Sequence, residues 1–360
     1  MRRLHIWFLF CFGLLIAIPT LGLGVNAARI LLAGAISADG EMSSGTKIPE
    51  RVDEFIQTHF GFRQDLVEMN GDLKTYFSSQ SPRVVWGADE WLFITDNDVF
   101  SQITGQRVDV EAVGRLAAVM QRLNEDSLGK GRALVVAIAP EKHTIYRHKL
   151  PRWARVTAAR TELDVLLGQM REAAVNAVDL RPVLLSRVAD RPVYWRGDTH
   201  WTEFGAALGF NQIVSALGLP QQRIDVDASY GPEQSMSRKG DLVGLMAIKG
   251  DWLEIHKPPI DPQMLSLEAY DRTVLRKVGR YETFRLRHKS SPADIASRPK
   301  VLVIGDSFSE TFFPPLFMRF ASEYVWAQRR VTNVDQAFID EIDPDIIVFE
   351  TVERTINLFR

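Results

Sequence analysis

A chain of 360 residues with 46% hydrophobic residues has enough apolar material for one large domain or two domains of ordinary size. The formal net charge is only −2 and no long run of one sign occurs, which argues against nucleic acid as the main partner, because phosphate binding needs clustered lysine and arginine. The single cysteine, Cys11, excludes an internal disulfide and a cysteine metal site elsewhere in the chain.

The N-terminal segment has the pattern of a targeting sequence. Arg2 and Arg3 precede a stretch without charged residues that extends to Ala28, which is long enough to cross a bilayer as a helix. The two arginines favour the cytoplasmic side, so the sequence predicts a signal anchor over 1–28 that leaves the remaining chain in the periplasm, attached to the inner membrane. A signal peptide cleaved after small residues near Ala27 is the alternative. Residues 29–50 are predicted to form a linker.

The remaining residues, 51–360, read as one domain of alternating helices and strands. In chain order we expect helical residues over 51–80, a hairpin over 86–94, a helix over 110–123, a strand over 133–139, a helix over 160–174, a strand over 175–180, a helix over 203–217, a strand over 301–305, a phenylalanine-rich helix or loop, and a strand over 345–350. Residues 221–299 look irregular and are predicted to form an insertion or lid. The alternation predicts an α/β fold, a three-layer sandwich with a mostly parallel sheet.

Two short polar runs in this domain contain residue types that suit catalysis. The apolar strand over 301–305 leads into Asp306 and Ser307, and the carboxyl end of a parallel strand is where open α/β sheets bind ligands. Upstream, Asp198 and His200 stand in the run RGDTHW. Ser307 as nucleophile, His200 as its base and Asp198 as the group that orients the imidazole would make an acyl-transfer site.

Each of these residues also has an ordinary interpretation. Ser307 is compatible with a turn or a helix N-cap, and Asp198 with a cap for the helix that follows. An Asp-x-His pair is also compatible with a metal site, but no third ligand lies near it in the sequence. The sequence therefore predicts neither a metal nor a cofactor.

Five blocks in this order resemble one known family. They are HFGFR at 59–63, GADEWLF at 87–93, PEKHTIY at 140–146, GDTHW at 197–201 followed by GDSF at 305–308, and ETVER at 350–354. Together they resemble the SGNH-hydrolase-like domain of bacterial alginate O-acetyltransferases of the AlgJ/AlgX type, over roughly residues 48–355. That family places its histidine upstream of the serine and two residues after the aspartate, as in this chain, unlike ordinary SGNH esterases.

The resemblance implies an SGNH-like fold and an O-acetyltransferase with a Ser307, His200 and Asp198 triad. It implies acetylation of hydroxyls on an exopolysaccharide, alginate-like or cellulose-like, through an acetyl-serine intermediate. It also implies two partners, the polysaccharide acceptor and a membrane-bound O-acyltransferase that supplies the acetyl group.

Further candidates for the substrate side come from three of these blocks and from the run RKGDL at 238–242. Two of them, Lys142 and Tyr146, could line a sugar site or belong to a solvated loop, and Trp201 could stack on a sugar or pack inside. A second pair, Glu350 and Arg354, follows the last strand and could shape the site or start a helix. The remaining candidate is a glycine that could contribute to an oxyanion hole, Gly240.

Two other functions remain open at this point. An acetylesterase would use the same triad with water as the acceptor. A non-catalytic polysaccharide-binding subunit of a secretion complex would not need Ser307.

Overall fold

The computed structural model describes residues 80–81, 83–155, 160–290, 295–332 and 334–358. The predictions for residues 1–79, including the anchor and the linker, lie outside the described residues. Among the described residues, no helix combines the length and the apolar character needed to cross a bilayer. The described residues up to 245 and from 250 onward form one compact unit, which contains all the features discussed below.

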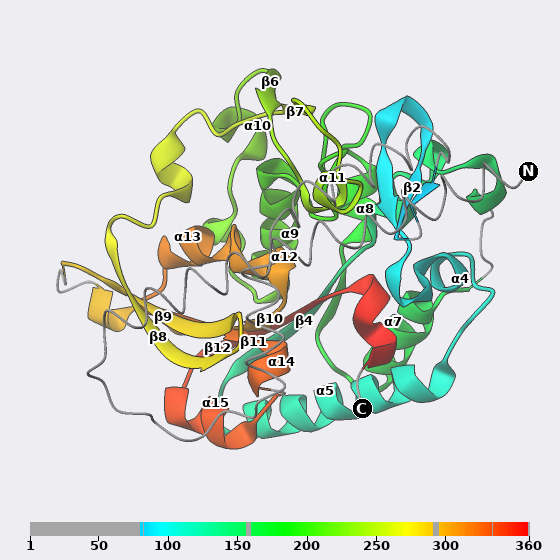
Figure 1. The fold of residues 1–360 in the computed structure, drawn as a ribbon. Helices are drawn as coiled ribbons and strands as arrows, with labels where there is room; N and C mark the ends of the chain where they lie inside the picture. The colour runs from blue at the N-terminus through cyan, green and yellow to red at the C-terminus, as the bar shows by residue number, and fades with distance from the viewer. Residues whose placement is uncertain (1–79, 82, 156–159, 291–294, 333, 359–360) are drawn as a thin grey trace, which may run out of the picture. The chain divides into compact units, whose positions relative to one another are not determined.

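A seven-stranded mixed sheet is the centre of this unit (Figure 1). Its first five strands run parallel, and its last two pair antiparallel at one edge. In spatial order the strands are β5 (Ala177–Asp179), β4 (Ala133–Ala139), β12 (Ile346–Val352), β10 (Lys300–Gly305), β11 (Glu323–Gln328), β9 (Tyr281–His288) and β8 (Tyr270–Val278). The three central strands are buried on both faces, as expected of a parallel sheet between two helical layers.

One face of the sheet packs on three helices: α5 (Val110–Gly129), α7 (Glu162–Glu172) and α15 (Gln336–Ile342). Leu116, Leu166 and Ile339 project from them onto Val136 and Ile304 of the sheet, and all five side chains are at most 1% exposed. Local signals fix two of these helices. The Asp109 side chain accepts a hydrogen bond from the N–H of Ala112, and a capping box opens α7.

The opposite face carries α9 (Glu203–Ala216) and α13 (Phe313–Met318). Phe210 of α9 and Phe317 of α13 meet edge to face with ring centroids 5.1 Å apart, and Phe317 also stacks on Tyr324 of β11. The predicted three-layer α/β sandwich therefore describes this unit. The phenylalanines after Ser307 belong to this layer of the core.

Shorter elements complete the described part of the chain. The helices are α4 (Val99–Ile103), α6 (Lys142–Ile145), α8 (Arg181–Leu185), α10 (Val226–Ser229), α11 (Asp241–Leu245), α12 (Ser307–Glu310) and α14 (Arg329–Thr332). Two small sheets join β1 (Gln80–Ser81), β2 (Val84–Trp86) and β3 (Leu92–Ile94), and β6 (Gln234–Ser237) with β7 (Leu253–His256). The β2–β3 pair confirms the predicted hairpin over 86–94.

Two predictions about secondary structure need correction. Residues 221–299 are not irregular throughout, because β8 and β9 extend the main sheet and β6 and β7 form a second hairpin. Both β8 and the outer positions of β9 carry exposed charged residues, so their sequence lacks the apolar run of a buried strand. In addition, β11 was not predicted in the phenylalanine-rich stretch after residue 305.

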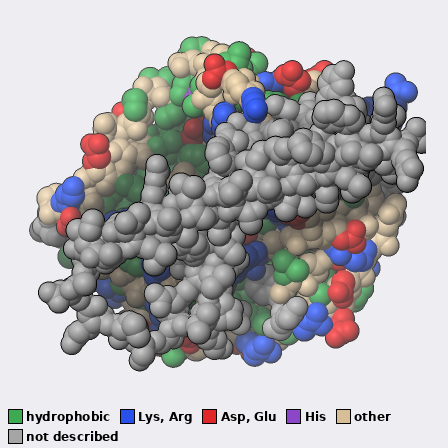
Figure 2. All heavy atoms as spheres, viewed as in Figure 1, with side chains coloured by type: hydrophobic (Ala, Val, Ile, Leu, Met, Phe, Trp, Pro, Cys, Tyr) green, Lys and Arg blue, Asp and Glu red, His purple; other side chains and the backbone are tan. Residues whose placement is uncertain are grey.

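Charged side chains are mixed by sign on the visible surface. Figure 2 shows acidic and basic groups close together along the edge of this face. Among the ion pairs of the described residues, Lys130 at the C-terminus of α5 pairs with Asp126 and Asp340, with N–O distances of 2.8 and 2.7 Å.

Candidate active site

Ser307 begins the short helix α12, directly beyond the carboxyl end of β10. The turn into this helix is tight, because a Cβ on Gly305 would lie 2.0 Å from Oγ of Ser309. Asp306 caps the helix: its Oδ1 accepts from the N–H of Phe308 at 3.0 Å, and its Oδ2 accepts from the N–H of Val352 on the neighbouring strand at 2.9 Å. Asp306 is thus a turn former, and it leaves the side chain of Ser307 exposed.

The three residues predicted as a triad form a continuous hydrogen-bonded series. His200 Nε2 lies 2.8 Å from Oγ of Ser307, and His200 Nδ1 lies 2.7 Å from Oδ1 of Asp198. The same Asp198 oxygen accepts from the backbone N–H of His200 at 3.0 Å, so the carboxylate holds both the backbone and the imidazole of His200. The imidazole packs against Phe308, with ring centroids 4.8 Å apart. This geometry lets His200 take the serine proton while Asp198 holds the ring.

Asp198 is buried yet surrounded by groups that favour its charge. Its second oxygen, Oδ2, accepts from Nη1 of Arg238 at 2.8 Å and from the N–H of Asp241 at 3.3 Å. Burial opposes ionisation, but the hydrogen bond and charge of His200, followed by the charge of Arg238, hold the pKa of Asp198 well below its usual range. Arg238 is itself held 4.6 Å above the ring of Trp195. The carboxylate therefore stays ionised beside the imidazole.

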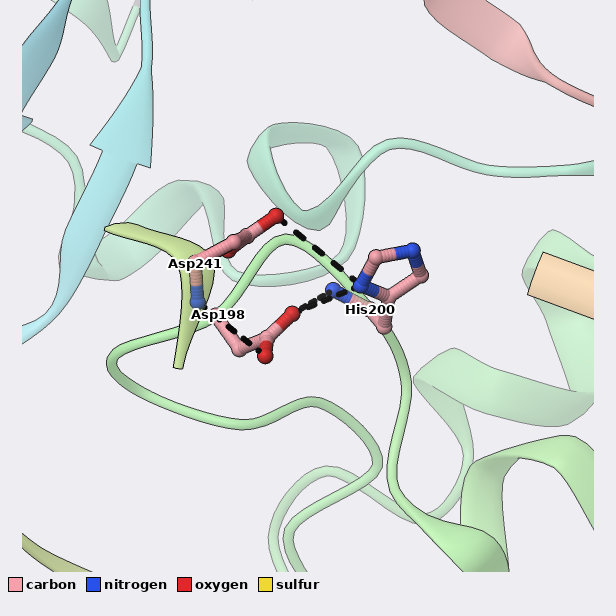
Figure 3. Close-up of side chains that lie close together, drawn as sticks. All are labelled: Asp198, His200 and Asp241. Atoms are coloured by element: carbon pink, nitrogen blue, oxygen red, sulfur yellow. Dashed lines mark hydrogen bonds and ion pairs between the residues drawn. The ribbon is translucent and has the colours of Figure 1, made fainter. Parts of the chain in front are cut away.

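A second carboxyl group lies close to the same imidazole (Figure 3). Oδ2 of Asp241 is 3.9 Å from His200 Nδ1, but the hydrogen bonds of this carboxylate are with Thr199: Oδ1 accepts from the backbone N–H at 2.8 Å and Oδ2 accepts from the hydroxyl at 2.5 Å. Burial and the neighbouring charge of Asp198 raise the pKa of Asp241.

One ligand atom each from Asp198, His200 and Asp241 lies within 4.8 Å of the others, a composition that suits a cation. The arrangement fits a metal poorly, because Nδ1 of His200 is engaged with Asp198 and the guanidinium of Arg238 already supplies positive charge there. We therefore do not assign a metal to these three residues.

A pocket of about 360 Å³ opens beside Ser307. It is formed at the carboxyl ends of three adjacent strands and at the β8–β9 turn, the edge at which α/β sheets bind ligands. Its lining is rich in arginine: Asn97, Arg280, Tyr281, Asp306, Ser307, Glu310, Gln328, Arg329, Arg330, Val352, Arg354 and Thr355.

Three residues predicted for the substrate side are instead buried. Lys142 donates to three backbone carbonyls, and Tyr146 accepts from the N–H of Val193 at 2.9 Å. Trp201 is 0% exposed and donates from Nε1 to the carbonyl of Phe308 at 3.0 Å. These three side chains lie inside the protein and do not line the pocket beside Ser307.

Gly240 has a packing role as well. A Cβ at this position would lie 2.3 Å from the carbonyl oxygen of Gly197 and 2.6 Å from Cβ of Asp198. The glycine is needed because α11 begins in contact with the turn that carries Asp198.

The last two candidates differ from each other. Glu350 is 0% exposed beneath the active-site turn, where its Oε2 accepts from the N–H of Asp306 at 3.3 Å. Burial, and then the charge of Asp306, raise the pKa of Glu350 well above its usual range. Arg354 lines the Ser307 pocket, one of the two alternatives left open by the sequence, and Glu141 holds it with an Nη1–Oε1 distance of 2.6 Å.

Sequence reasoning missed Arg238, Asp241 and Glu254, which support the triad from residues 221–299. Arg238 and Asp241 lie close to Gly240 in the run SRKGDL. The charged residues around this candidate glycine were therefore the sequence signal that could have identified them. Glu254 had none, because a single glutamate in an alternating strand looks like a solvated residue.

Glu353 offers a test of the buried charges behind the pocket. Its Oε2 accepts from the N–H of Glu141 and the hydroxyl of Thr144, both at 2.8 Å, and burial raises its pKa to about 7 from an ordinary 4.5. The pKa of Glu353 is higher in the folded state than in the unfolded chain, so the protonated carboxyl contributes stability to the fold. This contribution is complete below pH 4.5 and is lost as the pH rises through 7. Across that window the loss corresponds to roughly 3 kcal/mol of unfolding free energy.

We expect Glu353→Gln to unfold with a weaker pH dependence than the wild type between pH 5 and 8. Denaturant titrations at several pH values measure this. Parallel curves for the two proteins would contradict the assignment.

Comparisons with known proteins agree with the fold. Residues 84–333 match the family model described as SGNH hydrolase-like domain, acetyltransferase AlgX. The matched range includes Asp198, His200 and Ser307.

Among curated proteins, the chain is 26% identical over 179 residues to the probable alginate O-acetylase AlgJ of Pseudomonas syringae pv. tomato, covering 48% of this chain and 43% of that protein. It is 27% identical over 203 residues to the protein of the same name from Pseudomonas aeruginosa, covering 54% and 49%. The chain thus spans about half the length of the curated relatives it matches. The structure of Bacillus cereus PatB1 with a sulfonyl adduct covers 76% of this chain and 97% of that one, with a TM-score of 0.53 and 14% identity, which indicates a shared fold.

Proposed function

The chain belongs to the family of SGNH hydrolase-like domains of the acetyltransferase AlgX, and on that premise we propose that it transfers acetyl groups to the hydroxyls of a polysaccharide. The observation that carries the proposal is the series from Ser307 through His200 to Asp198, with distances of 2.8 and 2.7 Å, at a pocket beside the serine. Nearly the same parts would serve hydrolysis, so the acceptor distinguishes the two reactions.

The first half of the reaction forms an acetyl-serine. Oγ of Ser307 attacks the carbonyl carbon of an acetyl donor while His200 Nε2 takes the hydroxyl proton. The tetrahedral intermediate collapses, the donor's leaving group takes the proton from His200, and the acetyl group stays on Ser307. Asp198 remains ionised throughout and stabilises the imidazolium. The backbone N–H of Ser307 is the proposed first donor to the oxyanion.

The second half reverses these roles. A sugar hydroxyl enters the pocket and loses its proton to His200 as its oxygen attacks the acetyl carbon. The ester bond to Ser307 breaks, and the serine oxygen regains the proton from His200. Water in place of the sugar would give acetate, which is the acetylesterase reaction.

The pocket favours an acceptor with negative charge. Four arginines line the pocket, against two acidic residues, Asp306 and Glu310. Two of the arginines, Arg280 and Arg330, donate to the hydroxyl of Tyr281 at 3.2 and 3.0 Å. Guanidinium groups suit carboxylates. Of the two acceptors considered, an alginate-like polyuronate is therefore preferred to a neutral cellulose-like chain.

The setting is part of the proposal. We place the reaction in the periplasm at the inner membrane, to which residues 1–28 would anchor the chain. A membrane-bound O-acyltransferase would supply the acetyl group. No metal or cofactor takes part in the proposed steps.

The test combines a chromogenic acetyl ester with oligouronates or cello-oligosaccharides, using the wild type and Ser307→Ala. Mass spectrometry should find acetylated oligouronate and an acetyl group on Ser307, both lost in the variant. Ester cleavage without an acetylated sugar would instead favour the esterase. Equal behaviour of the wild type and Ser307→Ala would favour a non-catalytic binding subunit.

A further inference from the structure

The turn that carries Asp198 is held by two buried side chains of opposite charge. Lys142 of α6 is 1% exposed, and its Nζ lies 3.0, 2.9 and 2.7 Å from the carbonyl oxygens of Trp195, Arg196 and Asp198. All three ammonium protons therefore have acceptors, and all three acceptors belong to one stretch of four residues.

Glu254 of β7 binds the N–H groups of the same turn. It is 0% exposed; its Oε2 accepts from the N–H of Arg196 at 3.0 Å, and its Oε1 accepts from the N–H of Gly197 at 2.7 Å. Oε1 also accepts from Nε1 of Trp252 at 2.8 Å, which fixes the carboxylate. Carbonyls on one side and N–H groups on the other are thus held by charge-assisted hydrogen bonds.

The packing around the turn leaves it little freedom. A Cβ on Gly197 would lie 2.5 Å from Cγ2 of Val243 and 2.6 Å from Nε1 of Trp252. On the other side, Nζ of Lys142 lies 5.5 and 5.3 Å from the ring centroids of Trp91 and Phe93.

Burying two charges is costly, and well-packed apolar residues hold a loop at lower cost. The location of this pair is therefore informative. It acts on the backbone directly before His200, whose two ring nitrogens must each stay within hydrogen-bond distance of a partner.

We propose that Lys142 and Glu254 are positioning residues that hold the backbone of residues 195–198 and thereby set Asp198 and His200 for proton transfer. The inference rests on the proposed function for its catalytic part. The clamp itself, meaning Lys142 and Glu254 on this turn, can be tested without any reaction.

The charge of Lys142 makes the clamp sensitive to pH. Burial lowers the pKa of Lys142 to about 8, against the charges of Asp241, Asp198, Glu254 and Glu141 around it. Below that pH the ammonium serves three carbonyls; above it the amine has two protons and one carbonyl loses its donor. The clamp should therefore weaken as the pH rises above 8.

The first experiment measures hydrogen–deuterium exchange in the full chain. We expect Glu254→Gln, which keeps the shape of the side chain, and Lys142→Met to speed exchange at the amides of Arg196 and Gly197 by about tenfold or more. The control is Lys149→Met in the next turn, where the lysine pairs with exposed Asp89; its exchange at these amides should match the wild type.

The second experiment follows ester turnover. Both clamp variants should lose about tenfold in kcat with KM within about threefold of the wild type, since misplacement affects the chemical step. The fall in wild-type kcat above pH 8 should be absent in Lys142→Met. Each single variant leaves a buried charge without its counter-charge. The double variant Lys142→Met/Glu254→Gln should therefore show a smaller fold-loss in kcat than the product of the fold-losses of the two single variants.

The outcomes separate the two proposals. Faster exchange in the variants with no turnover by the wild type would retain the clamp and reject the proposed function. Unchanged exchange and unchanged kcat in Glu254→Gln would overturn the clamp, even if Lys142→Met failed to fold.

Discussion

Asp198→Asn is expected to lower the rate of acetyl transfer about 10³- to 10⁴-fold while the protein stays folded, as loss of the orienting carboxylate does in serine triads. The amide cannot stabilise the imidazolium that forms when Ser307 loses its proton. If its NH₂ group faces Nδ1, it also favours the wrong tautomer, with the proton on Nε2 facing the serine. Single-turnover acetylation of Ser307, followed by mass spectrometry, measures the effect directly.

The neighbouring carboxyl group provides a matched control. Asp241→Asn removes a charge 3.9 Å from the same ring nitrogen, but Asp241 bonds to Thr199 and not to His200. We expect a loss below about tenfold, the scale of one weakened hydrogen bond. A larger loss in Asp241→Asn than in Asp198→Asn would move the orienting role to Asp241. Circular dichroism of both variants checks that folding is retained.

Much of this site was predictable because its signals are local in the sequence. A buried apolar strand that ends in Gly-Asp-Ser fixes the place of Ser307, and the Asp-x-His spacing puts Asp198 and His200 in one turn. The strand over 133–139 and the helix over 203–217 were predicted closely, since each has a continuous apolar pattern and a clear boundary.

The supports of the triad were harder to predict because they depend on contacts between distant parts of the chain. A lysine beside a glutamate just after a strand looks solvent-exposed, and nothing near Lys142 shows that it reaches a turn 53 to 56 residues away. Likewise, Glu254 lies in a strand whose alternate residues, Leu253 and Ile255, are 56% and 47% exposed. In β7 the apolar side chains therefore face outward and Glu254 faces inward, where it binds the N–H groups of the turn at Arg196 and Gly197.

Gly240→Ala is expected to produce the second large effect. The added Cβ would lie 2.3 Å from the carbonyl oxygen of Gly197 and 2.6 Å from Cβ of Asp198, distances that require the backbone to move. Overpacking of this kind costs roughly 1–3 kcal/mol of unfolding free energy. The shift falls on the turn that carries Asp198, so we expect kcat to fall about 10²-fold, as displacements near 1 Å can cause.

Gly244→Ala is the matched control, one helical turn further along in α11. A Cβ there meets nothing within 4 Å, and alanine restricts the unfolded chain, so this variant should gain about 0.5–1 kcal/mol with kcat unchanged. Denaturant unfolding and ester turnover measure both variants. If Gly240→Ala kept wild-type stability and lost only kcat, its N–H would regain the oxyanion role predicted from the sequence. Loss of both is the result expected of a glycine that lets α11 approach the catalytic turn.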